Sequence, residues 1–237
     1  PPKKRISQEM NNAYYRPQIN IPPVVKNLLI INVLVFLTQQ LLPKGLEAWF
    51  YETFALSFPL GIKTAFQSVS YMFMHANFSH IFFNMFAVLM FAPALEERWG
   101  GKRFLIYYLV TGLGAAVVQE AVWALQIQPV LNSLDPLMAA KLANRVVTIG
   151  ASGAVFGILL AFGWLFPEVR MFIMFIPIPI RARTLVIIYA LVELFAGLAP
   201  SAGDNVAHFA HLGGMIFGFL LIMYWRKKNR NNGQFYY

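Results

Sequence analysis

Long apolar segments constrain this chain more than any other feature of its sequence. A helix needs about 20 predominantly apolar residues to cross the hydrocarbon core of a bilayer. Only 12% of the residues are charged, against about 25% in an ordinary soluble domain. A water-soluble fold cannot bury so much apolar surface. We therefore predict an all-α, polytopic membrane protein with six transmembrane helices. The six predicted spans are 24–42, 78–95, 104–127, 149–166, 184–198 and 206–225.

The distribution of basic residues predicts the orientation of these spans. Cytoplasmic loops of membrane proteins carry an excess of Lys and Arg. With the N-terminus inside, 15 of the 19 Lys and Arg residues fall on the inner side, and only Lys44, Lys63, Lys141 and Arg145 fall outside. We therefore expect a multi-pass protein with both termini in the cytoplasm. We further expect the membrane to be a bacterial inner (cell) membrane. The basic charge reflects topology and does not indicate a nucleic-acid partner.

The chain is predicted to form one membrane domain with two short tails. Residues 1–23 form a basic cytoplasmic tail, 24–226 the six-helix domain and 227–237 a second basic tail. The first span lacks the cleavage site of a signal peptide, so we expect it to be retained. The outer loop 43–73 is expected to hold short interfacial helices, and the loop 129–147 one surface helix. The absence of cysteine excludes disulfides, thiolate metal sites and a cysteine nucleophile.

Polar residues within the predicted spans form one layer below the outer surface. Ionisable groups inside a bilayer are costly and indicate function by default. At about 1.5 Å of rise per residue, the polar groups of five segments fall at one depth. We infer a water-accessible cavity that opens to the outside. The layer contains His75, His80, Asn84, Glu120, Ser152, Glu193, His208 and His211.

Ser152 and His211 have the surroundings expected of a nucleophile and its base. Each is followed by two glycines four residues apart, which give its helix a face of small residues; the pairs are Gly153 with Gly157 and Gly214 with Gly218. Small residues let helix backbones approach closely, so we expect these two faces to meet. A neutral imidazole can then take the serine proton as general base.

His80 and Asn84 lie four residues apart and therefore share one helix face. Both can donate a hydrogen bond to an oxyanion, together with the backbone N–H of Ser152. Each residue taken alone also has a structural interpretation. A membrane serine often bonds back to its own helix, and histidine or asparagine often bonds a neighbouring helix.

Together these residues resemble the motifs of the rhomboid family of intramembrane serine proteases, from Tyr71 to Gly218. His80 to Asn84 matches HxxxN on the family's second helix. Gly150 to Gly153 matches GxSG on the fourth helix, and Ala210 to Gly218 matches AHxxGxxxG on the sixth. Glu96-Glu97-Arg98 resembles the ExR motif just inside the second helix.

The resemblance implies a role for each matching residue. Ser152 would be the nucleophile and His211 the general base of a dyad with no acidic third member, and none is visible in the sequence near either residue. His80, Asn84 and the Ser152 amide would form the oxyanion hole. Phe156 would pack on the catalytic histidine. The other matches would be supporting residues: Gly150, Gly153, Gly157, Gly214, Gly218, His75, His208, Glu96 and Arg98.

The implied activity is cleavage of single-span membrane proteins in or near the transmembrane helix, usually after a small residue. Water would enter from the outer face, and no metal or organic cofactor is required. The partners would be transmembrane substrates and the lipid bilayer. One departure concerns the first outer loop, where the family often has Trp-Arg and this chain has Phe66-Gln67. We expect the anchoring of that loop to differ.

Glu193 lies in the fifth span and outside the family motifs, with no Lys or Arg in its own span. One interpretation is a neutral glutamate that bonds a neighbouring helix. The other is a gate, because the fifth helix of the family faces the second across the side where substrate is thought to enter. A hydrogen bond from Glu193 across that gap would hold the gate shut.

Three other functions remain open from the sequence. A metal or haem protein would use His75, His80, His208 and His211 as ligands, although no HExxH motif is present. A non-catalytic rhomboid-like binding protein would typically lack the serine or the histidine. A transporter would fit the cavity, but the chain shows no paired broken helices and no second half.

Overall fold

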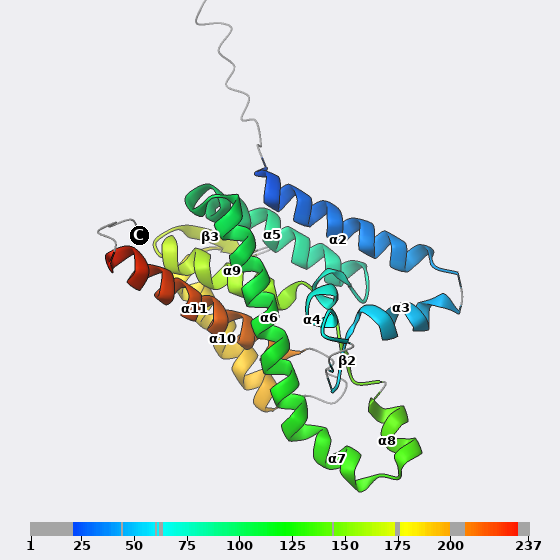
Figure 1. Ribbon diagram of the computed structural model, residues 1–237. Coiled ribbons are helices and arrows are strands. Elements are labelled where there is room, and N and C mark those ends of the chain that lie inside the picture. Colours follow the sequence, from blue (N-terminus) through cyan, green and yellow to red (C-terminus); the bar gives the residue numbers. More distant parts are fainter. Residues whose placement is uncertain are drawn as a thin grey trace, which may run out of the picture.

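The computed structural model describes residues 21–43, 45–59, 61, 64–143, 145–173, 176–199 and 207–231, and its six longest helices form a bundle. Each predicted span corresponds to one of them (Figure 1). They are α2 (Pro23–Leu41), α5 (Phe78–Trp99), α6 (Gly101–Gln126), α9 (Ser152–Leu165), α10 (Ala182–Leu198) and α11 (His208–Asn231).

Within the described residues, four helices are long and apolar enough to cross a membrane: α2, α5, α11, and α6 with its extension to Ser133. Their outward faces carry exposed apolar side chains such as Leu34, Leu89 and Leu220, as lipid contact requires. The chain is therefore an integral membrane protein with several spanning helices. α9, with 14 residues, and α10, with 17, are shorter, so the count of six spans stays a prediction.

Short elements of the two loops that are predicted to lie outside the membrane, here called the outer loops, gather at one end of the bundle (Figure 1). The first loop contains α3 (Leu46–Phe54), β1 (Leu56–Ser57), α4 (Gln67–Ser70) and the 3-10 helix η2 (Tyr71–Phe73); the second contains α7 (Gln128–Ser133), α8 (Pro136–Ala143) and β2 (Val147–Thr148). The second loop thus holds two short helices where one was expected. β1 pairs antiparallel with β2, so that Leu56 faces Thr148 and the two loops are joined.

A second pair of strands corrects the all-α expectation. β3 (Arg170–Ile173) and β4 (Ile176–Arg181) form an antiparallel hairpin between α9 and α10. Pro177 and Pro179 lie within β4, and proline lacks the N–H that a helix needs. The prolines therefore separate the helices on either side and leave this connection extended.

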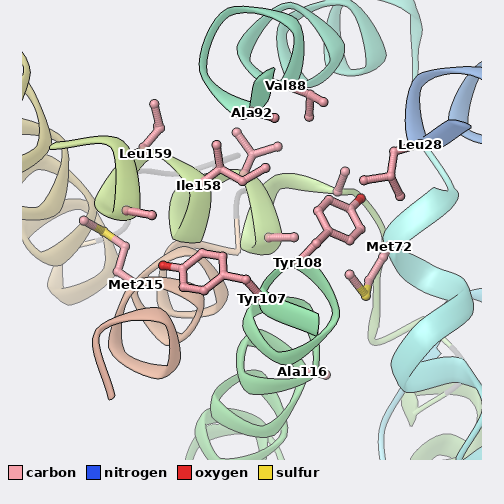
Figure 2. Packing of buried hydrophobic residues seen from close by; sticks show 14 of the residues in the cluster. Leu28, Met72, Val88, Ala92, Tyr107, Tyr108, Ala116, Ile158, Leu159 and Met215 are labelled. Atoms are coloured by element: carbon pink, nitrogen blue, oxygen red, sulfur yellow. The ribbon is translucent and has the colours of Figure 1, made fainter. Parts of the chain in front are cut away.

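The core lies between α2, α5, α6, α9 and α11, whose side chains meet in one buried cluster (Figure 2). Tyr107 and Tyr108 of α6 are completely buried there. The Tyr107 hydroxyl donates to the carbonyl oxygen of Gly157 at 2.9 Å. A buried hydroxyl without a partner would cost free energy, so this bond both satisfies Tyr107 and ties α9 to α6.

Glycines let α9 and α11 approach each other at backbone distance. A Cβ atom on Gly214 would clash with the carbonyl oxygen of Gly153, which confirms the predicted contact at this level. The prediction that Gly157 and Gly218 continue this contact between α9 and α11 is wrong. A Cβ on Gly157 would clash with Thr111, and one on Gly218 with the Tyr107 hydroxyl. Both of these glycines therefore make room for α6.

Gln67 anchors the first outer loop through four hydrogen bonds. Its side chain is 1% exposed. Its oxygen accepts from the hydroxyl of Ser57 at 2.7 Å and from the Ser57 backbone at 3.3 Å. Its amide donates to the carbonyls of Glu52 at 2.9 Å and Thr53 at 3.2 Å. In this chain, which has Phe66-Gln67 where the family often has Trp-Arg, the side-chain amide of Gln67 therefore fixes the loop.

Glu96, near the C-terminal end of α5, links this helix to the N-terminus of α2. It is 4% exposed, and its carboxylate accepts hydrogen bonds from the backbone N–H groups of Val24 at 3.0 Å and Val25 at 2.8 Å. The first N–H groups of a helix lack intrahelical acceptors, so a carboxylate there both caps α2 and complements its dipole. Arg98 lies exposed at the same end of α5.

We predict that Gly214→Val destabilises the protein. The valine side chain must push α11 away from α9, and overpacking of this kind costs about 1–3 kcal/mol or more. For a chain of this size that corresponds to about 2–12 °C in the midpoint of thermal unfolding, measured in detergent. The matched control is Leu220→Val on the outer face of α11, where the side chain is 55% exposed. Equal midpoints for the two variants would contradict the close approach.

Candidate active site

Ser152 is the first residue of α9 and follows a turn that is fixed on both sides. Gly150 adopts a φ of +133°, a conformation that favours glycine. Its N–H donates to the carbonyl of Tyr71 at 2.9 Å, and the Tyr71 hydroxyl donates to the carbonyl of Gly112 at 2.7 Å. The predicted span 149–166 thus begins only at Ser152. The Ser152 N–H therefore has no acceptor within its own helix.

His211 lies in the first turn of α11 and faces Ser152. Its Nε2 is 2.8 Å from the serine Oγ, the separation expected of a nucleophile and its general base. The imidazole side chain is 9% exposed. Phe156 stacks on it with ring centroids 4.3 Å apart and ring planes 5° from parallel. The structure therefore brings together the three residues that sequence placed on α9 and α11.

His80 and Asn84 lie beside Ser152 on the first turns of α5. Nδ1 of His80 accepts from the N–H of Ala76 at 3.4 Å, which puts the ring proton on Nε2. That edge of the ring faces Gly150, since a Cβ there would lie 2.8 Å from His80 Nε2. The Asn84 amide donates to the His80 carbonyl at 2.9 Å and has a second N–H. Both residues thus offer a donor near the serine.

A cavity of about 1110 Å³ opens in front of Ser152, between α5 and α10. Apolar side chains line most of it, including Phe83 and Met90 of α5 and Leu185 and Tyr189 of α10. His80, Asn84 and Ser152 are among the polar residues that line the same cavity. A cavity of this kind binds a mostly apolar ligand and orients it by a few polar contacts.

Glu193 bonds a neighbouring helix, as the first interpretation of the sequence expected, and its partners are the two histidines of α11. Its Oε2 lies 2.9 Å from Nδ1 of His211 and 2.6 Å from Nδ1 of His208, and the residue is 8% exposed. The prediction that no acidic residue lies near the dyad is therefore wrong. So is the predicted bond across the cavity to α5, because α10 packs on α11 and turns the carboxylate toward it.

His75 lies in the loop before α5 and contacts His80 instead of Ser152 or His211. Its backbone is held by Gln39, which accepts from the His75 N–H at 3.1 Å and donates to the His75 carbonyl at 3.4 Å. The His75 ring lies edge-on to His80, with centroids 5.0 Å apart. Burial, followed by the neighbouring His80, lowers the pKa of His75 to about 3. The ring is therefore neutral near pH 7 and adds no charge beside His80.

Among the described residues, one group of side chains has donor atoms close enough together to bind a metal ion. It consists of Glu193, His208 and His211, whose donor atoms all lie within 4.8 Å of one another. Ligands bound at about 2.0–2.2 Å to a tetrahedral zinc lie more than about 3 Å apart. The carboxylate oxygen is only 2.6 Å from Nδ1 of His208. The spacing is therefore that of hydrogen bonds, and it does not favour the metal alternative.

Comparison with known proteins agrees with these motifs. The family model described as "Rhomboid domain" matches residues 63–228. The chain is 27% identical to the rhomboid relative YdcA of Bacillus subtilis, over 86% of this chain and 88% of that protein. It is 29% identical to the mitochondrial rhomboid protein 1 of Saccharomyces cerevisiae, over 83% of this chain and 51% of that protein. It is also 30% identical to the rhomboid protease AarA of Providencia stuartii, over 63% of this chain and 52% of that protein.

The match therefore spans most of YdcA but about half of the other two relatives. The family model covers residues from the first outer loop to the inner end of α11, well over half of the chain. This range contains Ser152, His211, His80 and Asn84. The chain belongs to the rhomboid family of intramembrane proteases.

Proposed function

We propose that the chain is an intramembrane serine endopeptidase that cleaves single-span membrane proteins in or near their transmembrane segments. The observation that carries the proposal is the 2.8 Å separation between Ser152 Oγ and His211 Nε2, at the edge of an apolar cavity. The family membership supports the same reaction class. The expected preference for cleavage after small residues rests on the resemblance alone.

In the proposed reaction, Ser152 Oγ attacks the scissile carbonyl carbon while His211 Nε2 takes the hydroxyl proton. The negative charge moves to the carbonyl oxygen. Collapse of the intermediate breaks the C–N bond, and His211 passes its proton to the leaving amine. A water then attacks the acyl group on Ser152 with His211 again as base. The products are a carboxylate, an amine and the free serine.

The oxyanion of each tetrahedral intermediate would be held by three donors around Ser152. They are the backbone N–H of Ser152 at the start of α9, Nε2–H of His80, and the second N–H of the Asn84 amide. The first belongs to a helix N-terminus, where the partial positive charge favours an anion. Donors fixed before the reaction stabilise developing charge without reorganisation.

The cavity between α5 and α10 supports a transmembrane segment as substrate. Its apolar walls suit the side chains of a membrane helix, and Ser152, His80 and Asn84 line the same cavity. Under the positive-inside rule both termini lie in the cytoplasm. Ser152 and the outer loops would then face the outer side, from which water reaches the serine.

We predict that Ser152→Ala and His211→Ala each abolish cleavage of a single-span substrate in liposomes. Nucleophile and base act as a unit, so the double variant should be no slower than either single one. Mass spectrometry of the products gives the cleaved bond, and thermal unfolding in detergent verifies the fold. Substantial turnover by folded Ser152→Ala would contradict the serine-protease assignment.

We also predict that His80→Ala and Asn84→Ala weaken cleavage without abolishing it. Loss of one oxyanion donor costs about 10²–10³ in kcat. Initial rates at saturating substrate measure this effect directly. Ser79→Ala, beside His80 on the same cavity wall, is the matched control and should keep near wild-type turnover. If both His80→Ala and Asn84→Ala also turn over at the wild-type rate, the two residues only pack helices.

A further inference from the structure

We infer that Glu193 is a positioning residue that extends the Ser152–His211 pair into a Ser–His–Glu triad, with His208 as the second donor that holds the carboxylate. The inference rests on the proposed function, since it assigns a role within the same site. It concerns a residue outside the three family motifs.

The first argument is the order of the contacts. Ser152 Oγ, His211 and Glu193 Oε2 form a chain in which Nε2 of the imidazole faces the hydroxyl at 2.8 Å and Nδ1 faces the carboxylate at 2.9 Å. Each imidazole nitrogen therefore has one partner, and the two partners come from different helices, α9 and α10. A buried acid on the far nitrogen of the base is the arrangement that orients the histidine of a hydrolytic triad.

The second argument concerns the position of a proton. A carboxylate is an acceptor only, so it requires the proton of His211 on Nδ1. Nε2 then presents its lone pair to Ser152, which is the tautomer that a general base needs. A histidine without such a partner divides its proton between both nitrogens. Glu193 would thus hold the base in its competent form before substrate arrives.

The third argument concerns charge during the reaction. When His211 takes the serine proton it becomes an imidazolium inside a buried site, where an uncompensated charge is costly. Glu193 lies in direct contact and supplies the opposite charge. In the resting state, the N–H groups of His208 and His211 satisfy the same carboxylate oxygen. The carboxylate is therefore stabilised both before and after proton transfer.

His208 fixes the carboxylate from the same helix that carries the base. His208 and His211 are three residues apart and share one face of α11, and their rings lie edge to face with centroids 6.4 Å apart. Gly197, one turn after Glu193, brings α10 close to this face: a Cβ there would lie 3.2 Å from His208 Cβ. Packing thus sets the position of the acid relative to both rings.

The kinetic test compares Glu193→Gln with the wild-type protein, using the full chain in liposomes and a single-span substrate. The amide keeps the size of the side chain but offers an N–H to the histidine, which favours the wrong tautomer. We expect kcat to fall by about 10²–10⁴-fold, the range that general-base function contributes, with KM changed by less than about threefold. Glu193→Asp keeps the acceptor and should recover part of the rate.

The matched control is Glu97→Gln, which removes an exposed carboxylate near the end of α5 and should leave kcat within a few-fold. The variant Glu193→Leu distinguishes a role of Glu193 in the triad from a role as a gate. Loss of a gate would raise the rate on transmembrane substrates, whereas loss of a triad member lowers it. A folded Glu193→Gln protein with near wild-type kcat, or a faster Glu193→Leu protein, would overturn the inference.

A second measurement tests the inference on the wild-type protein, even if the Glu193 variants fail to fold. The chain has four histidines, so ¹⁵N NMR of histidine-labelled protein can assign each ring by single substitutions. We expect the proton of His211 on Nδ1 in the wild-type protein, and a proton on Nε2 would overturn the inference. Activity that persists in Ser152→Ala would instead defeat the proposed function, while the NMR result would still report on Glu193.

Discussion

The contact between Gly214 and Gly153 is the constraint on which the site depends. Because Gly214 has no Cβ, the backbone of α11 can approach the carbonyl of Gly153 on α9 so closely, and Gly153 in turn makes room for Ala115 of α6. That approach brings Ser152, at the start of one helix, to hydrogen-bond distance from His211, in the first turn of the other. α6 supports the pair from behind, since the Tyr107 hydroxyl holds the Gly157 carbonyl of α9.

Two polar groups beside the dyad are satisfied by hydrogen bonds that also build the site. The Tyr71 carbonyl accepts from Gly150 and fixes the turn before Ser152. The buried carboxylate of Glu193 takes two imidazole donors and so determines how His211 points. In an apolar medium an unpaired group of either kind would be costly. The demands of the membrane and those of catalysis are therefore met by the same hydrogen bonds.

Much of this arrangement was predictable, because it depends on patterns local to the sequence. Apolar length located the six helices, and the motifs around His80, Ser152 and His211 placed the residues of the site. The partner of Glu193 was not predictable, since it depends on how α10 is rotated against α11. The common depth of Glu193, His208 and His211 was the available signal. Gly157 and Gly218 were assigned to the wrong helix pair for the same reason, because spacing gives a face but not its neighbour.

The central claim is that Ser152 is a nucleophile activated by His211, and labelling with a fluorophosphonate probe tests it most directly. The probe reacts with an activated serine hydroxyl without requiring a transmembrane substrate. Peptide mapping of the labelled protein should place the adduct on Ser152, and His211→Ala should lose the label while remaining folded. An adduct on another residue, or equal labelling of folded His211→Ala, would contradict the account.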